Sequence, residues 1–128
     1  MTRTIIAALC LAAGLCSAAW GQAKNNVPDP ILGAPTVTVE HIKVHGASLE
    51  GNLEGDAVDR DVIVFLPPSY ASDTSRRYPV VYALHGYSIG AEQWSQEIHV
   101  PQTIEGAYAK GAKGMIVVLP DSKTVHNG

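Results

Sequence analysis

The chain has 128 residues, of which 46% are hydrophobic and 16% charged, and its 9 basic and 12 acidic side chains give a formal net charge of −3. This composition is typical of one globular domain and excludes a disordered tail. A mildly acidic chain without clusters of Lys or Arg is not expected to bind nucleic acid, because few cations are available to neutralise phosphates.

The first residues have the pattern of a secretory signal peptide. Arg3 provides a positive charge, residues 5–15 form an apolar run, and small residues follow. The run is shorter than the roughly 20 apolar residues that cross a bilayer, so we expect cleavage and no membrane contact afterwards. We therefore predict a signal peptide over residues 1–21 and a secreted or periplasmic product. Cys10 and Cys16 lie in this segment, so the mature chain would have no disulfide framework.

The next segments change from linker to strand. Residues 22–35 contain several prolines among polar residues and predict an extended linker, followed by a folded domain over residues 36–128. The alternating β-branched residues of 36–45 predict one or two edge strands interrupted near Glu40. Residues 61–66 are a short apolar run, which is typical of a strand buried on both faces.

The second half of the chain predicts a crossover between two further strands. Residues 80–84 and 115–119 are apolar runs, and Pro101 can begin a helix between them that Gly111 ends. A helical crossover of this kind joins parallel strands, so we predict an α/β fold. His41 and His45 can share a face of the first strand, but they lack a third ligand, so we predict no metal site.

Four motifs resemble a known family. They are residues 60–70, which end in Leu-Pro-Pro-Ser-Tyr; residues 78–86, which end in His-Gly; Trp94; and residues 115–121, which end in Pro-Asp. In this order they resemble the esterase D-like branch of the α/β-hydrolases, which includes feruloyl, acetylxylan and enterochelin esterases, formylglutathione hydrolases and mycolyltransferases. The resemblance implies the N-terminal part of an α/β-hydrolase sheet, with about four strands and one crossover helix, and therefore an incomplete domain.

The function that the resemblance implies is a secreted serine esterase that forms an acyl-enzyme, without a cofactor. Its substrate would be a small-molecule or polysaccharide-linked ester. In this branch the Ser nucleophile follows a fifth strand, and the acid and His come later, so the chain would be an inactive N-terminal fragment. The third strand, residues 80–84, would then be an exposed apolar edge that promotes aggregation. An acyltransferase of the same fold, or a non-catalytic secreted binding module or degenerate remnant, is the alternative.

The turn after the third predicted strand has two interpretations, and the first is an oxyanion hole. Gly86 permits a tight turn, and the resemblance implies that the backbone N–H of Tyr87 donates to the developing oxyanion. Ser88 would then be a loop hydroxyl and a candidate helix N-cap. Trp94 would line the substrate pocket or pack in the core. His85 is expected to support the turn rather than to act as a base.

The second interpretation makes Ser88 the nucleophile. Residues 86–90 match the G-x-S-x-G pattern between a strand and a helix, which is also the context of a nucleophile elbow. Asp121 and His126 follow in the order that a Ser, acid, His triad requires. The residues alone leave this compact triad open. The position of the motif on the third strand favours the oxyanion interpretation.

Overall fold

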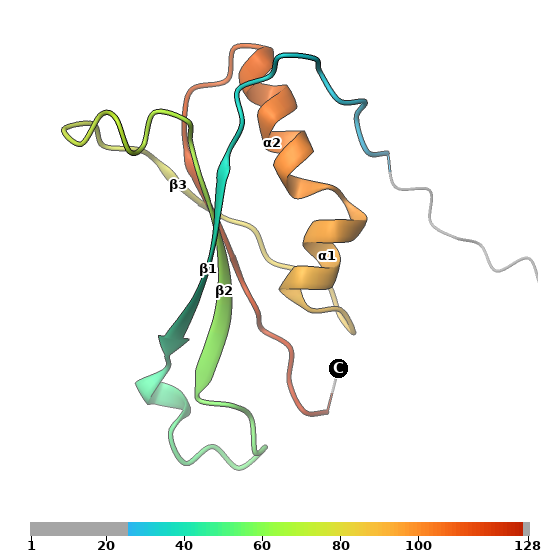
Figure 1. Ribbon diagram of the computed structural model, residues 1–128. Coiled ribbons are helices and arrows are strands. Elements are labelled where there is room, and N and C mark those ends of the chain that lie inside the picture. The colour runs from blue at the N-terminus through green and yellow to red at the C-terminus, as the bar shows by residue number, and fades with distance from the viewer. Residues whose placement is uncertain (1–25, 127–128) are drawn as a thin grey trace, which may run out of the picture.

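The computed structural model describes residues 26–126, so the predicted signal peptide lies outside the described residues. The chain forms a four-stranded sheet with two α-helices on one of its faces (Figure 1). In chain order the elements are β1 (Thr38–His45), the short 3-10 helix η1 (Ala47–Leu49), β2 (Asp59–Leu66), β3 (Val80–Tyr82), α1 (Ala91–Glu97), α2 (Val100–Ala109) and β4 (Ile116–Pro120).

The strand order in the sheet is β1-β2-β4-β3. β2 pairs antiparallel with both β1 and β4, whereas β3 and β4 are parallel. Parallel neighbours need a crossover connection, and α1 and α2 provide it. The α/β fold and the helical crossover that the sequence predicts are therefore confirmed.

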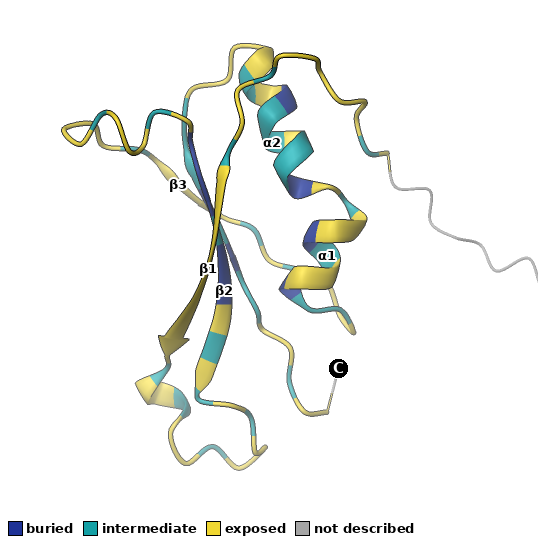
Figure 2. Cartoon of the chain, in the orientation of Figure 1, coloured by how far each residue is buried: buried dark blue, intermediate teal, exposed yellow. Residues whose placement is uncertain are grey.

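The hydrophobic core lies between the sheet and the helices. Ile63 pairs with Leu119 and Phe65 pairs with Val117, and this register directs all four side chains to the helix-covered face. Ala91 and Val100, at the starts of the two helices, complete the buried cluster. Figure 2 shows that the buried residues lie in the central strands and on the sides of the helices that face the sheet.

The opposite face of the sheet has exposed apolar side chains and is covered by no helix among residues 26–126 (Figure 1). Ile42 and Val44 on β1 and Val80 and Tyr82 on β3 are exposed there. Sheets with parallel strands usually have both faces covered. This face and the β3 edge beside it are therefore the largest departure of the chain from an ordinary α/β sheet.

Two details of the strands differ from the sequence prediction. β1 is not interrupted near Glu40, because Glu40 pairs with Val64 in the same register as its neighbours and its side chain is exposed on the uncovered face. β3 is shorter than residues 80–84, since its ladder with β4 ends at Tyr82. The predicted helix that begins at Pro101 is confirmed as α2.

Residues 26–37, which contain the described part of the predicted linker, have no helix or strand and lie along α2. The Val37 N–H donates to Glu105 Oε1 at 3.0 Å, and the Gln102 side-chain amide donates to the Pro28 carbonyl.

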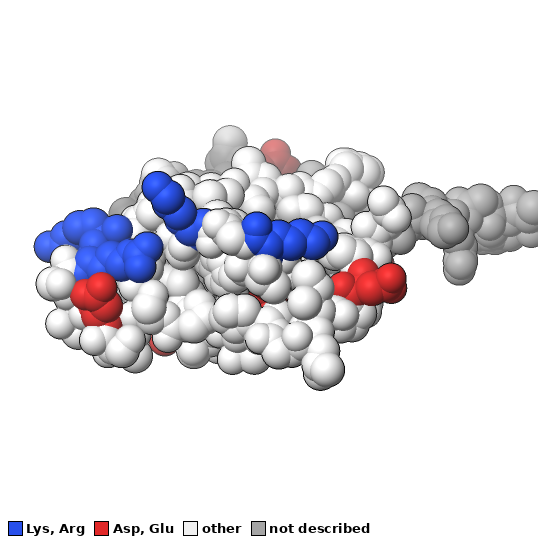
Figure 3. Space-filling model, turned by 90° about the horizontal axis from the view of Figure 1, so that it is seen from above, with Lys and Arg blue, Asp and Glu red and all other residues white. Residues whose placement is uncertain are grey.

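Within residues 26–126 no helix is long and apolar enough to cross a membrane. Seen from above, the Lys and Arg side chains form separate groups with uncharged surface between them (Figure 3).

Candidate active site

The candidate site is the connection between β3 and α1, residues 83–90, which we call the β3–α1 turn. The Ala83 N–H continues the sheet pairing by donating to the Val118 carbonyl at 2.9 Å, and the chain then leaves the sheet. Ser88 has a φ of 64°, in the left-handed region that few residues other than Gly adopt. The turn lies at the carboxyl end of a parallel strand, which is where open α/β sheets bind ligands.

His85 fixes the start of this turn. Its side chain is only 4% exposed, although the loop around it is open. Nδ1 lies 2.9 Å from the Gly86 carbonyl oxygen, and Nε2 accepts the Ser122 N–H at 2.8 Å. His85 therefore joins the β3–α1 turn to the residues that follow β4. The expectation that His85 supports the turn agrees with these two contacts.

Asp121 fixes the other end of the turn. Its Oδ2 accepts the N–H of Ala91, the first residue of α1, at 3.2 Å, and its Oδ1 accepts the Lys123 N–H at 2.8 Å. The N-cap residue of α1 is Gly90, which has no side chain to offer, so Asp121 supplies the acceptor from another loop. The prediction that Ser88 caps this helix is therefore wrong.

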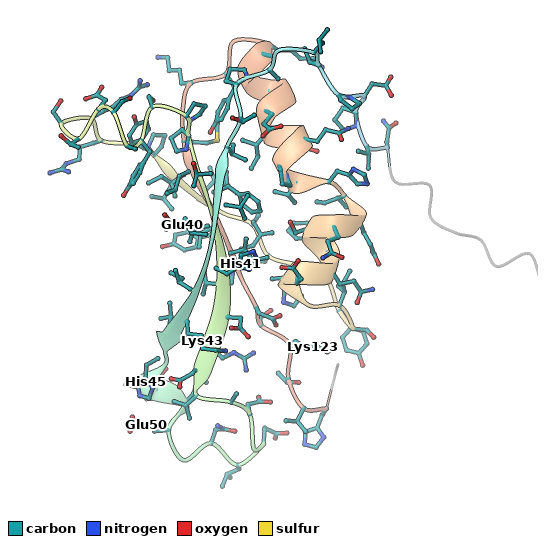
Figure 4. The ribbon with its side chains drawn as sticks, in the orientation of Figure 1. Glu40, His41, Lys43, His45, Glu50 and Lys123 are labelled. Atoms are coloured by element: carbon teal, nitrogen blue, oxygen red, sulfur yellow. The ribbon has the colours of Figure 1, made fainter. Side chains whose placement is uncertain are left out.

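The loop after β4, residues 121–126, is itself fixed by β2. The Asp121 N–H donates to the Asp61 carbonyl at 2.8 Å. Arg60 donates from Nε to the Asp121 carbonyl at 3.2 Å and from Nη2 to the carbonyl of Lys123, which Figure 4 labels. Sequence reasoning missed these roles of Arg60 and Ser122, because a side chain that binds a distant backbone carbonyl or N–H has no spacing signature.

The alternative triad residues have other partners. His126 Nε2 lies 3.1 Å from Glu54 Oε2, and both Asp121 carboxylate oxygens accept backbone N–H groups. Between residues 26 and 126, no hydrogen bond joins Ser88 to Asp121 or His126. The structure thus brings Asp121 to the turn but leaves the three triad candidates unconnected.

The interpretation of the turn as an oxyanion hole concerns Tyr87, Gly86 and Trp94. The Tyr87 side chain is exposed, and among the described residues no hydrogen bond uses its backbone N–H. Gly86 accepts from His85, which sets the direction of the peptide that leads into Tyr87. Trp94, on α1, is half-buried and packs against the core cluster. A free N–H on a fixed turn can donate to a ligand oxygen.

A second polar cluster lies at the far end of β1 (Figure 4). His45 Nδ1 is 2.8 Å from Asp59 Oδ1, and its Nε2 is 2.8 Å from Glu50 Oε1. The hydrogen bond to Glu50, and then that to Asp59, raise the pKa of His45 above 6.5. Within residues 26–126 no group of three His, Cys, Asp or Glu side chains is arranged to hold a metal ion.

Comparison with known proteins identifies the family. The esterase family described as "Putative esterase" matches residues 57–127, which is more than half of the chain. The chain belongs to this esterase family. The match includes β2, the β3–α1 turn and the loop after β4, and so all the contacts of His85 and Asp121 described above.

Solved structures of esterases are similar to the chain. A ferulic acid esterase has 28% identity and a TM-score of 0.58 over 68% of this chain and 31% of that one. A CE1 ferulic acid esterase from Anaeromyces mucronatus, in complex with ferulic acid, has 30% identity and a TM-score of 0.60 over 78% of this chain and 35% of that one. The structure of the same enzyme without substrate has 30% identity and a TM-score of 0.59 over 78% of this chain and 36% of that one.

The chain thus spans about a third of the length of these esterases. The feruloyl-esterase branch, which four motifs indicated, is confirmed by the family match and by these structures. The strands and helices of the chain correspond to part of the α/β-hydrolase fold of esterases.

Proposed function

We propose that this chain supplies half of the oxyanion hole of a serine carboxylic-ester hydrolase. The observation that supports the proposal is the Tyr87 N–H, which has no partner among the described residues and lies in a turn fixed by His85 at the carboxyl end of β3. Membership of an esterase family gives the reaction class. The geometry of the turn supports the oxyanion role that we propose for this chain in that reaction.

The chemistry follows from the charge that develops in ester cleavage. When a Ser oxygen attacks the ester carbonyl, the carbonyl oxygen becomes negatively charged, and a fixed N–H donor stabilises it. One such donor is worth about a hundred- to a thousandfold in kcat. Collapse of the tetrahedral intermediate expels the alcohol and leaves an acyl-enzyme, which water then hydrolyses.

The remaining catalytic groups are proposed to lie beyond Gly128. The matched part of this chain covers only 31% and 35% of two of these esterases, which leaves room in them for a nucleophile elbow, an acid and a His. The second oxyanion donor would be the residue after that nucleophile. We therefore propose that residues 1–128 alone do not hydrolyse esters, and that an acyltransferase would differ only in whether water or an alcohol accepts the acyl group.

The proposed substrate is an ester of a small aromatic acid, free or linked to a polysaccharide. This follows the ferulic acid esterases that the chain resembles in sequence and structure. We also propose export to the periplasm or the medium, on the signal-peptide pattern of residues 1–21. We propose no cofactor for this chemistry, since acyl transfer through a Ser needs none.

The compact triad keeps one observation in its favour. Ser88 is exposed and has a positive φ on a turn between a strand and a helix, as the nucleophile of an elbow does. Its weakness is that Ser88 has no hydrogen bond to a base among the described residues. The two proposals make opposite predictions for a Ser88 variant.

The test compares release of 4-nitrophenol from an aryl ester by the 128-residue chain and by the product of its whole reading frame. Our proposal expects turnover, with a burst of acyl-enzyme formation, from the longer product only, and no loss in its Ser88→Ala variant. Turnover by the 128-residue chain that Ser88→Ala abolishes, with circular dichroism unchanged, would establish the compact triad instead.

A further inference from the structure

His85 is buried in the β3–α1 turn and contacts two backbone groups from different loops. We infer that His85 is a positioning residue that holds the Tyr87 N–H toward the reacting oxygen, by joining the β3–α1 turn to the loop after β4 as a neutral imidazole with its proton on Nδ1. This inference rests on the proposed function, because it assigns a cause to the orientation of the oxyanion donor.

The tautomer follows from the partners of the two ring nitrogens. The Ser122 backbone N–H can only donate, so Nε2, 2.8 Å away, must present a lone pair. The Gly86 carbonyl can only accept, so Nδ1, 2.9 Å away, must hold the proton. The same residue cannot serve as a general base through Nε2, because its lone pair is already engaged.

The contacts limit how the turn can move. Gly86 lies directly before Tyr87, so the bond from Nδ1 fixes the carbonyl of the peptide that leads into the donor. The bond to Ser122 fixes the ring against a loop that Asp61 and Arg60 hold in turn. A misplacement of about 1 Å in a catalytic group can cost about a hundredfold in rate, so such fixing has a measurable effect.

Protonation of His85 would break this arrangement. A protonated Nε2 and the Ser122 N–H would both be donors, and they would repel each other. Ser122 Oγ, 3.1 Å from Nε2, and Asp121 Oδ1, 3.6 Å from Nε2, are nearby acceptors that would then take the place of this contact.

Three substitutions separate the two contacts. His85→Gln can present its carbonyl oxygen near the position of Nε2 and keep the Ser122 N–H satisfied, whereas His85→Asn reaches only the position of Nδ1. His85→Phe keeps the ring volume and removes both contacts. We expect kcat of the whole reading-frame product to fall about tenfold to a hundredfold in the Phe variant, with KM changed less, and to fall by less in the Asn and Gln variants, which each keep one of the two contacts.

The wild-type tautomer is measured without any variant, by nitrogen NMR of the histidine-labelled 128-residue chain. We expect a protonated Nδ1 and an unprotonated Nε2 at neutral pH, which is the less common neutral form of free histidine. A proton on Nε2 would overturn the inference. So would a Phe variant that matches wild type in kcat.

A comparison with Tyr87→Pro separates this inference from the proposed function. Tyr87→Pro removes the donor itself, and Tyr87→Ala keeps it while removing the ring. If Tyr87→Pro lowers kcat more than Tyr87→Ala does but the His85 variants are unaffected, the oxyanion role stands and the positioning role falls. If Tyr87→Pro and Tyr87→Ala have equal kcat, the proposed oxyanion role falls, whatever tautomer His85 has.

Discussion

Gly90 and Asp121 lie so close together that no side chain fits between them. A Cβ built on Gly90 would lie 2.8 Å from Asp121 Oδ2, the oxygen that accepts the Ala91 N–H. The close approach lets a loop at the end of β4 cap a helix whose own N-cap position has no side chain. The two ends of the candidate site are thus fixed by residues 30 and more positions away in sequence.

Gly90→Ala is predicted to destabilise the fold by about 1 kcal/mol, the usual value of a lost N-cap. The new methyl group would displace the Asp121 carboxylate, which cannot move freely because Lys123 also donates to it. The midpoint of urea unfolding measures the change. Gly86→Ala is the matched control for stability, since its nearest contact would be 4.0 Å away. Equal midpoints for the two variants would contradict the capping account.

Ser88→Gly is predicted to stabilise the chain by up to about 1 kcal/mol. Ser88 has a φ of 64°, where a Cβ costs roughly 1–2 kcal/mol, and the greater freedom of Gly in the unfolded chain offsets part of the gain. Ser88→Val should lower stability, because a β-branched side chain tolerates this conformation least. Chemical denaturation ranks the three proteins, and an order of Val above Gly would show that the turn relaxes without strain.

The contacts of His45, at the end of β1 and far from the β3–α1 turn, predict that the stability of the fold depends on pH. Carboxylates only accept, so both of its 2.8 Å contacts can be hydrogen bonds only when both ring nitrogens are protonated. Since the pKa of folded His45 is raised above 6.5, its stabilising effect is complete below pH 6.5 and is lost as the pH rises through the raised value.

An NMR titration of the His45 ring tests this. We expect a midpoint above 6.5 that falls more in Glu50→Gln than in Asp59→Asn, because the Glu50 bond is the larger cause of the shift. A midpoint at or below 6.5, or one that neither variant changes, would mean that the ring is not held between the two carboxylates in solution.

Val80→Lys is predicted to reduce self-association of the 128-residue chain. The two sheet edges differ in this respect. β3 exposes Val80, Val81 and Tyr82, whereas β1, the other edge, includes Lys43 and other charged side chains that discourage pairing. Light scattering against concentration should show less association for Val80→Lys than for Ile42→Lys, a control of similar exposure on the same face of β1. A monomeric wild type with a sharp cooperative melt would contradict this prediction.

The sequence predicted the elements well because their signals are local. The apolar runs of β2 and β4, and Pro101 at the start of α2, depend on near neighbours, and the structure confirms them. β1 was expected to break near Glu40 because a polar residue interrupts the alternation, but the ladder with β2 outweighs that local signal.

The residues and hydrogen bonds that hold the candidate site in place could be predicted only in part. The His-Gly pair and Asp121 were visible as motif residues, and the sequence indicated that His85 supports the turn. The bond from Ser122 to His85 spans 37 positions and uses a backbone N–H, which every residue except Pro has. No residue type marks such a donor, so only the fold reveals it.

The most direct test of the central claim is kcat for an aryl ester, compared between Tyr87→Pro and Tyr87→Ala in the product of the whole reading frame. Both variants lack the Tyr87 ring, and only the Pro variant lacks the N–H. We predict that kcat of Tyr87→Pro is about a hundred- to a thousandfold below that of Tyr87→Ala, with both proteins folded by circular dichroism. Equal kcat values would show that the Tyr87 N–H does not stabilise the oxyanion.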